Sequence, residues 1–176
     1  PKPSSAASDV YKRQQLYRTD IMLQFNQSIK ESYSTMKLLS VAGDQIHQLL
    51  KQDVTVFQIE AKKVMQSASF GVSSSAHNHG TEDAETLSWV IENERRAGRL
   101  TDTFPGSKFL CIPIGTRPVK GIISIQFTDE DYIDTYDNSI LDSMLNDLTL
   151  AVENVALLKQ TRQSMVIAER EATRSN

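Results

Sequence analysis

The sequence predicts an α+β domain of two layers, in which a central antiparallel sheet carries the N- and C-terminal helices on one face. Three observations lead to this fold class. The expected elements follow the order helix, helix, strand, strand, helix, strand, strand, helix. Short links join the strands within each pair, as in antiparallel sheets. The chain has 176 residues, of which 39% are apolar, and its sequence contains no internal repeat. This length and composition suit a single domain with one core.

Two helices are expected before the first strand. Residues 1–14 show no apolar periodicity, but from Leu16 onwards apolar residues recur at steps of three and four, the spacing of an amphipathic helix. Residues 32–34 interrupt this pattern, and Ser34 is suited to cap a second helix. The second helix carries its own apolar stripe and ends near Gln52.

Two pairs of strands are expected after these helices. Residues 54–59 alternate and are rich in β-branched side chains, and a tight break separates them from a partner strand at residues 63–70. Residues 108–114 and 120–127 are nearly continuous apolar runs, which indicates central strands. Residues 115–118, Gly-Thr-Arg-Pro, join them as a hairpin-like link.

A third helix is expected between the two pairs of strands. Residues 71–80 have the composition of a loop, and Thr81 can cap a helix whose acidic first turn suits the positive end of its dipole. Trp89 and its apolar neighbours supply the buried side of this helix. Trp89 is expected to lie largely buried near the loop of residues 101–106. Gly98 is expected just past its C-terminal end.

The last helix is expected to run from about Asp134 to Arg174, because this stretch contains no glycine or proline. Its first half carries a wide stripe that must pack on the sheet, formed by Ile140, Leu141, Met144, Leu145, Leu148, Ala151, Val152 and Val155. Beyond this stripe, the apolar set thins to Leu158, Met165, Val166 and Ala172. Of these, Leu158, Met165 and Ala172 recur at every seventh position and form a narrow seam. Because this spacing is typical of coiled coils, we expect a weak parallel homodimer through the seam.

One central motif is the most specific feature of the sequence. It comprises Trp89-Val90-Ile91-Glu92-Asn93, Ala97-Gly98 and Thr101-Asp102-Thr103-Phe104-Pro105-Gly106. In this motif, the chain resembles the GAF domain of the KdpD family of potassium-responsive sensor histidine kinases. Near the N-terminus, Leu16-Tyr17-Arg18-Thr19 resembles the start of the same domain in that family. The resemblance covers about residues 16–176. Phe104 replaces the family's usual leucine, and little of residues 61–83 aligns.

The resemblance implies a GAF-like domain at residues 15–157 and, at residues 158–176, the start of a coiled-coil linker towards a missing histidine-phosphoacceptor domain. A parent of this family would be a protein-histidine kinase that takes phosphate from ATP and passes it to a KdpE-like response regulator. The chain itself would be a non-catalytic cytoplasmic module of the potassium or osmotic response. Its parent would be anchored in the bacterial inner membrane. The alternative is a GAF module of another signalling protein that binds a small ligand of the cyclic-nucleotide type.

Residues 1–14 are set aside from these expectations. Residues 9–14 resemble the translation of a transposase end sequence used in preparing sequencing libraries. We therefore interpret residues 1–14 as a sequencing or assembly artefact or a disordered tail, without a function of its own.

A GAF-like fold implies a pocket for an unidentified small ligand beside the central motif. The candidate residues are Trp89, Arg99, Thr101, Asp102, Thr103, Pro105 and Gly106. The alternative for the Thr-Asp-Thr segment is a loop whose side chains bond to its own backbone. The alternative for Arg99 and the basic residues around it is a solvated charge cluster.

Composition argues against several other classes of function. The single cysteine, Cys111, leaves no intrachain disulfide and no Cys-rich zinc site, and it is expected to be a small core residue. His77 and His79 have no clear third metal ligand, so no metal or cofactor is expected. The net charge of −3 does not favour nucleic acid. The sequence shows no credible nucleophile and no paired acid and base, so an enzyme is not expected.

Overall fold

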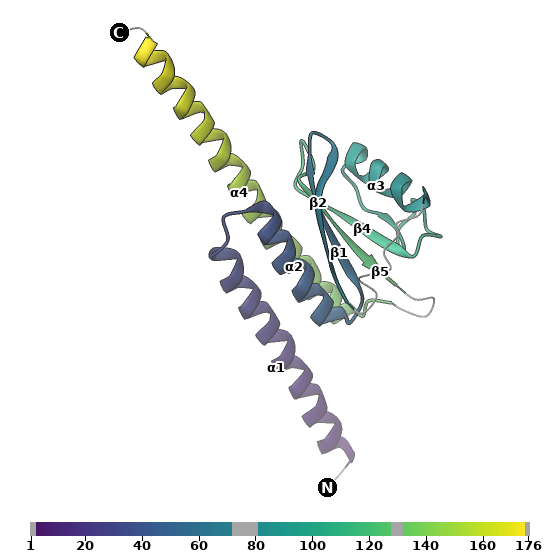
Figure 1. Ribbon diagram of the computed structural model, residues 1–176. Coiled ribbons are helices and arrows are strands. Elements are labelled where there is room, and N and C mark those ends of the chain that lie inside the picture. The colour runs from purple at the N-terminus through teal and green to yellow at the C-terminus, as the bar shows by residue number, and fades with distance from the viewer. Residues whose placement is uncertain (1–2, 72–80, 128–131, 175–176) are drawn as a thin grey trace.

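The computed structural model describes residues 3–71, 81–127 and 132–174. A five-stranded antiparallel sheet lies between helices, which confirms the α+β fold class (Figure 1). In chain order, the elements are α1 (Pro3–Lys30), α2 (Thr35–Leu50), β1 (Val54–Glu60), β2 (Lys63–Phe70), α3 (Thr81–Asn93), β3 (Ala97–Gly98), β4 (Phe109–Ile114), β5 (Gly121–Gln126) and α4 (Thr135–Arg174).

The sheet has the strand order β2-β1-β5-β4-β3, and every neighbouring pair is antiparallel. The two expected hairpin-linked pairs, β1–β2 and β4–β5, are confirmed. They meet where β1 pairs with β5, with Val56 opposite Ile123. β1, β5 and β4 are therefore the central strands of the sheet. The two-residue strand β3 extends the sheet beyond β4 and is too short for its sequence to predict.

The main core lies between the sheet and a layer of three helices. α2 and α4 contact the strands, and α1 packs on the outer side of α2 and α4. Figure 1 shows these three helices on one side of the strands and α3 on the other. The largest fully buried side chains in this core include Phe25, Leu38, Leu39, Ile46, Ile123, Ile125, Leu141, Met144 and Leu148. The wide apolar stripe expected on the last helix therefore packs as predicted.

A second, smaller core covers the opposite face of the sheet. α3 contacts β3 and β4 there. The buried members of this core are Phe57, Ile59, Leu87, Val90, Ala97, Cys111, Val119 and Ile122. The space between α3 and the central strands is thus filled by side chains of the protein itself.

Residues 3–14 and Gly98 differ from the sequence-based expectations. α1 begins at Pro3, so residues 3–14 are helical where a tail is expected, and residues 6–14 are all exposed. Gly98 belongs to β3 and does not cap α3, which is followed by Glu94 with φ 57°. Gly98 has φ +98°, and a Cβ atom there would lie 2.0 Å from the Phe109 carbonyl oxygen. This close approach of β3 to β4 requires glycine.

Candidate functional site

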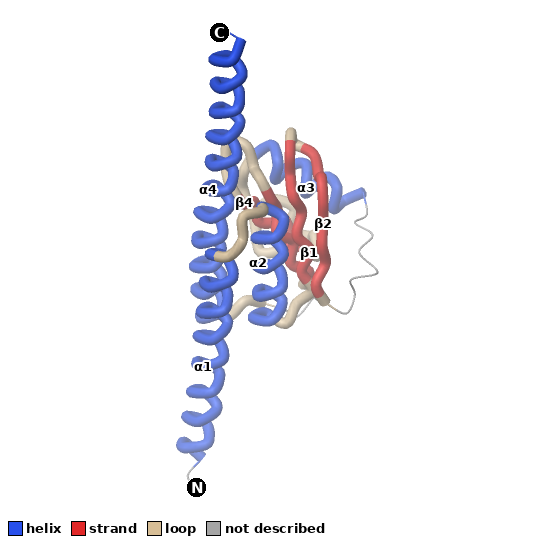
Figure 2. Tube along the Cα trace, turned by 60° about the vertical axis from the view of Figure 1, so that its left-hand side comes forward, coloured by secondary structure: helices blue, strands red, loops and turns tan. Residues whose placement is uncertain are grey.

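The two terminal helices form the most distinctive arrangement in the structure. α1 and α4 contact each other over part of their length and run in the same direction (Figures 1 and 2). Arg18 of α1 pairs with the start of α4, and Tyr33, just after α1, lines a cleft with Val155 further along α4. The free end of α1 points away from the domain at one end, and that of α4 at the other (Figure 1).

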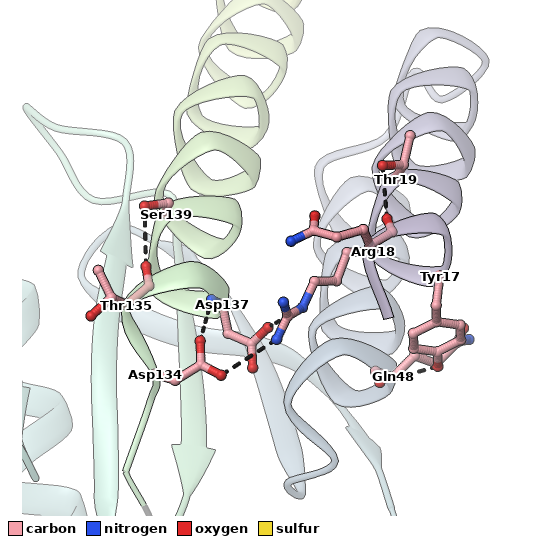
Figure 3. Close-up of polar contacts among 9 residues, drawn as sticks. Tyr17, Arg18, Thr19, Gln48, Asp134, Thr135, Asp137 and Ser139 are labelled. Atoms are coloured by element: carbon pink, nitrogen blue, oxygen red, sulfur yellow. Dashed lines mark hydrogen bonds and ion pairs between the residues drawn. The ribbon is translucent and has the colours of Figure 1, made fainter. Parts of the chain in front are cut away.

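Arg18 connects these two helices through its guanidinium group (Figure 3). Its Nε atom lies 2.9 Å from Asp137 Oδ1, and its Nη2 atom lies 3.4 Å from Asp134 Oδ2. The guanidinium carbon also lies 5.1 Å from the centroid of the Tyr136 ring, within the range of a cation–π contact. The Arg18 side chain is only 14% exposed. One arginine of α1 therefore holds three residues at the beginning of α4.

The same aspartates also cap α4. The backbone N–H of Asp137 donates to Asp134 Oδ1 at 2.8 Å, which satisfies one of the free donors of the first helical turn. Burial raises the pKa of Asp137, and this effect outweighs the neighbouring Arg18, which lowers it. The start of α4 thus combines a helix cap with a partly desolvated ion pair. Asp134 and Asp137 also place negative charge at the N-terminus of α4, where the helix dipole favours it.

The second half of α4 leaves the domain body. All described residues from position 157 onwards are exposed. Leu158 is 56% exposed and Met165 64%, and Ala172 is also exposed. These side chains are accessible to a second chain, as the seam requires. The dimer itself stays a prediction.

The Thr-Asp-Thr segment of the central motif bonds mainly to itself. The Thr101 hydroxyl oxygen lies 2.8 Å from each of the carbonyl oxygens of Gly98 and Thr103, which share its single hydrogen, and it accepts from the Thr103 N–H at 3.2 Å. The Gly98 N–H donates to the Thr103 carbonyl at 2.7 Å. These bonds are the ones expected of the self-capping alternative. Of the remaining candidates, Asp102, Pro105 and Gly106 are exposed and Arg99 is half-buried. Their role in ligand binding stays a prediction.

Trp89 lies beside this loop, as the sequence predicts, in contact with Phe104. The two rings meet edge to face, with centroids 6.5 Å apart and an interplanar angle of 85°. Trp89 is half-buried, so the expectation of a largely buried tryptophan is wrong. The reason is its place at the margin of the helix, because Leu87 and Val90 take the positions facing the sheet. Trp89 lines a shallow hollow, and none of the other six pocket candidates does so.

The structure contains a cleft that sequence reasoning missed. It has a volume of about 520 Å³ and lies where α4 leaves the domain, bounded by the N-terminus of α2, the β1–β2 turn and the β4–β5 link. Tyr33, Lys120 and Lys159 are among its lining residues. The Arg18 contact was missed as well, because 116 residues separate Arg18 from Asp134 and no local pattern pairs them.

The described part of the chain offers little for metal or redox chemistry. Within it, no three His, Cys, Asp or Glu residues form a group that could hold a metal ion, and His77 and His79 lie outside it. Cys111 is buried, and this burial raises the pKa of its thiol to about 11. Such a thiol is protonated at neutral pH and is a poor nucleophile. Among the same residues, no helix is long and apolar enough to cross a membrane.

Comparison with solved structures identifies the fold. The GAF domain of the potassium sensor histidine kinase KdpD from Escherichia coli superposes with a TM-score of 0.63 at 15% identity, covering 80% of this chain and 96% of that one. The GAF domain of an Acinetobacter phosphoenolpyruvate-protein phosphotransferase gives 0.55 at 16% identity, covering 82% and 98%. A methyl-accepting chemotaxis protein gives 0.56 at 12% identity, covering 77% and 98%. No family model matches the sequence. The chain therefore has the GAF fold.

Proposed function

We propose that this chain is a non-catalytic regulatory GAF module of a KdpD-like sensor histidine kinase, and that it relays a signal from α1 to α4. The observation that carries the proposal is the parallel pairing of α1 and α4, fastened by Arg18 at the first turn of α4. A shift or rotation of α1 would act on Asp137 and so on the direction of α4. Helix shifts of this kind are a common form of switching between two states.

The proposed output of this relay is the exposed half of α4. There Leu158, Met165 and Ala172 would pair with the same residues of a second chain, and the relay would change the arrangement of the two helices. A phosphoacceptor domain attached to these helices would be presented in one of two arrangements. The parent would lie in the bacterial inner membrane with this module in the cytoplasm, respond to potassium or osmotic change, and phosphorylate a KdpE-like response regulator. Its KdpD-like identity is supported by the resemblance of the central motif.

Two experiments test this function. The first is to sequence the same gene beyond Asn176, where a His-Asp/Glu-Leu-Arg-type phosphoacceptor motif is expected shortly downstream; its absence would exclude a histidine kinase parent. The second replaces the GAF segment of a KdpD-type kinase with residues 15–176 and measures autophosphorylation from ATP. Autophosphorylation should respond to the kinase's stimulus, and Arg18→Gln should weaken that response. A response that Arg18→Gln leaves intact would contradict the relay.

The cyclic-nucleotide alternative needs a separate measurement. Calorimetric titration of the domain with cyclic AMP and cyclic GMP should give no saturable heat under the relay proposal. Saturable binding of either nucleotide would favour the ligand-binding module instead.

A further inference from the structure

A shallow hollow of about 590 Å³ lies on the side of α3 that faces away from the sheet. Two aromatic side chains, Trp89 and Phe104, line it together with Ala84, Glu85, Ser88, Glu92 and Asn93. The inward side of α3 is occupied by the buried Leu87 and Val90. Trp89 and Phe104 are therefore only partly buried, and part of each ring is accessible at the surface.

Phe104 is held in this position at a conformational cost. Its φ angle is 56°, in the left-handed region that non-glycine residues adopt rarely, and its side chain is 39% exposed. The loop around it is tied down by the Thr101 hydroxyl bonds and by the Ser107 N–H, which donates to the Phe104 carbonyl at 3.1 Å. The Phe104 and Trp89 rings stand at 85° to each other. They form two aromatic walls at nearly a right angle.

Carboxylates flank the aromatic walls on the same face of the helix. Glu85 lies about one helical turn before Trp89 and Glu92 about one turn after it, so all three project from one side of α3. The helix contains four acidic residues and no basic one. A cation already reaches the rim of the hollow, because Lys62 Nζ lies 3.1 Å from Glu92 Oε2. Glu85 is exposed and forms no ion pair with any other residue that the structure describes.

We propose that this hollow docks an arginine side chain of a partner polypeptide. A guanidinium plane can stack on the indole of Trp89 while its N–H groups donate to Glu85, and its positive charge strengthens both contacts. A neutral planar group lacks that charge, and an anionic group would be repelled by Glu85. Lysine would supply the charge but not the planar stacking surface or the paired donors. The hollow is shallow, so it suits a side chain presented from another protein's surface better than a small molecule that must be enclosed. This inference does not depend on the relay between α1 and α4.

Trp89 is the only tryptophan of the chain, so its fluorescence reports directly on the hollow. The protein is titrated with an acetylated and amidated Gly-Arg-Gly peptide and with matched peptides carrying lysine or citrulline. The arginine peptide should give a saturable change, the lysine peptide a weaker one, and the neutral citrulline peptide none. Glu85→Gln and Phe104→Leu should each lower the affinity for the arginine peptide about two- to fivefold, as expected for exposed ion pairs and cation–π contacts.

Glu169→Gln serves as the matched control, because Glu169 is an exposed carboxylate far along α4. It should leave the affinity unchanged, and circular dichroism should show all variants folded. Since Glu85 is exposed, its variant keeps the test valid even where Phe104→Leu disturbs the loop. The proposal is overturned if the arginine peptide gives no saturable change, if citrulline or lysine binds as well, or if Glu85→Gln has no effect. Tighter binding of tetramethylammonium than of the arginine peptide would overturn the assignment to a partner polypeptide.

Discussion

The Nε atom of Arg18 lies 2.9 Å from Oδ1 of Asp137, and this ion pair joins the first helix of the chain to the first turn of the last one. Both side chains are mostly withdrawn from water, at 14% and 20% exposure. Apolar contacts support the same junction, because Ile21 and Phe25 of α1 are buried in the main core. Arg18 is thus positioned to couple the two helices, and its loss should be measurable in stability.

Arg18→Gln should reduce the free energy of unfolding by about 1–3 kcal/mol, between the values typical of exposed and of fully buried ion pairs. The variant leaves Asp137 without its cation and should raise the pKa of that carboxyl further. Because the attraction needs the charged carboxylate, the loss should shrink as the pH falls through the pKa of Asp137, which burial holds above its ordinary value of 3.8. It should be smallest below about pH 3, where aspartates are protonated in both states. Urea denaturation at neutral and acidic pH measures both effects.

Arg96→Gln is the matched control for that experiment. Arg96 pairs with Asp142 of α4 at 3.2 Å, but both side chains are about half exposed. Loss of this ion pair should lower the free energy of unfolding by less than about 0.5 kcal/mol. Equal losses for the two arginine variants would show that Arg18 forms only an ordinary surface ion pair.

Deletion of residues 1–14 should leave the melting temperature unchanged. Residues 6–14 are helical but exposed, so their removal uncovers little apolar surface. A longer deletion, through Phe25, should unfold the domain, because it removes Ile21 and Phe25 from the core. Thermal denaturation followed by circular dichroism compares the three chains. A clear drop in melting temperature for the short deletion would show that residues 1–14 stabilise the fold.

Much of the fold follows from local sequence patterns. The alternation of residues 54–59 and the wide stripe on the last helix were sufficient to predict β1 and the buried face of α4. Strand order is a different matter, since the pairing of β1 with β5 is set by long-range packing that no local pattern encodes. β3 was missed because two residues carry no periodicity. The helix at residues 3–14 was missed because its residues form no apolar stripe, and residues 6–14 are all exposed.

The candidate site could be predicted only in part. Composition and spacing placed Trp89 next to the Thr-Asp-Thr loop, and the Trp89–Phe104 contact bears this out. The same patterns predicted a largely buried Trp89, and this prediction was wrong. The apolar character of a residue does not show whether it lies at the centre of a helix face or at its margin. The pairing of Arg18 with Asp134 and Asp137 depends on how α1 packs on α4. That packing is a property of the whole fold.

Trp89→Ala should lower the free energy of unfolding by about 1–3 kcal/mol. Truncation of a fully buried large aromatic side chain typically lowers it by roughly 3–5 kcal/mol. Phe25→Ala supplies the comparison, since Phe25 is completely buried in the main core. Urea denaturation of the two variants against the parent chain measures the difference. A loss for Trp89→Ala as large as that for Phe25→Ala would mean that Trp89 belongs to the core.

Cys111 should make the protein less stable between about pH 9 and pH 11. Burial raises the pKa of its thiol from 9.0 to about 11, so the folded chain keeps a proton that the unfolded chain releases. Stability therefore falls as pH rises through this window, by on the order of 2 kcal/mol. Cys111→Ala is the control, because all other groups titrate in it as they do in the wild type. The free energy of unfolding of the variant minus that of the wild type should therefore rise between pH 8 and pH 11. A constant difference across this range would contradict the buried, protonated thiol.

The exposed half of α4 should hold a weak parallel dimer that dissociates on dilution, because its seam is sparse and interrupted by polar residues. Leu158→Asp combined with Met165→Asp should abolish this dimer and leave the domain folded, since both side chains are more than half exposed. Met144→Asp with Leu148→Asp should instead unfold it, because both residues are fully buried. Sedimentation velocity over a range of concentrations, with circular dichroism of each variant, separates these outcomes. A wild-type chain that stays monomeric at high concentration would contradict the seam, and a seam variant that unfolds would show that Leu158 and Met165 serve the domain's own core.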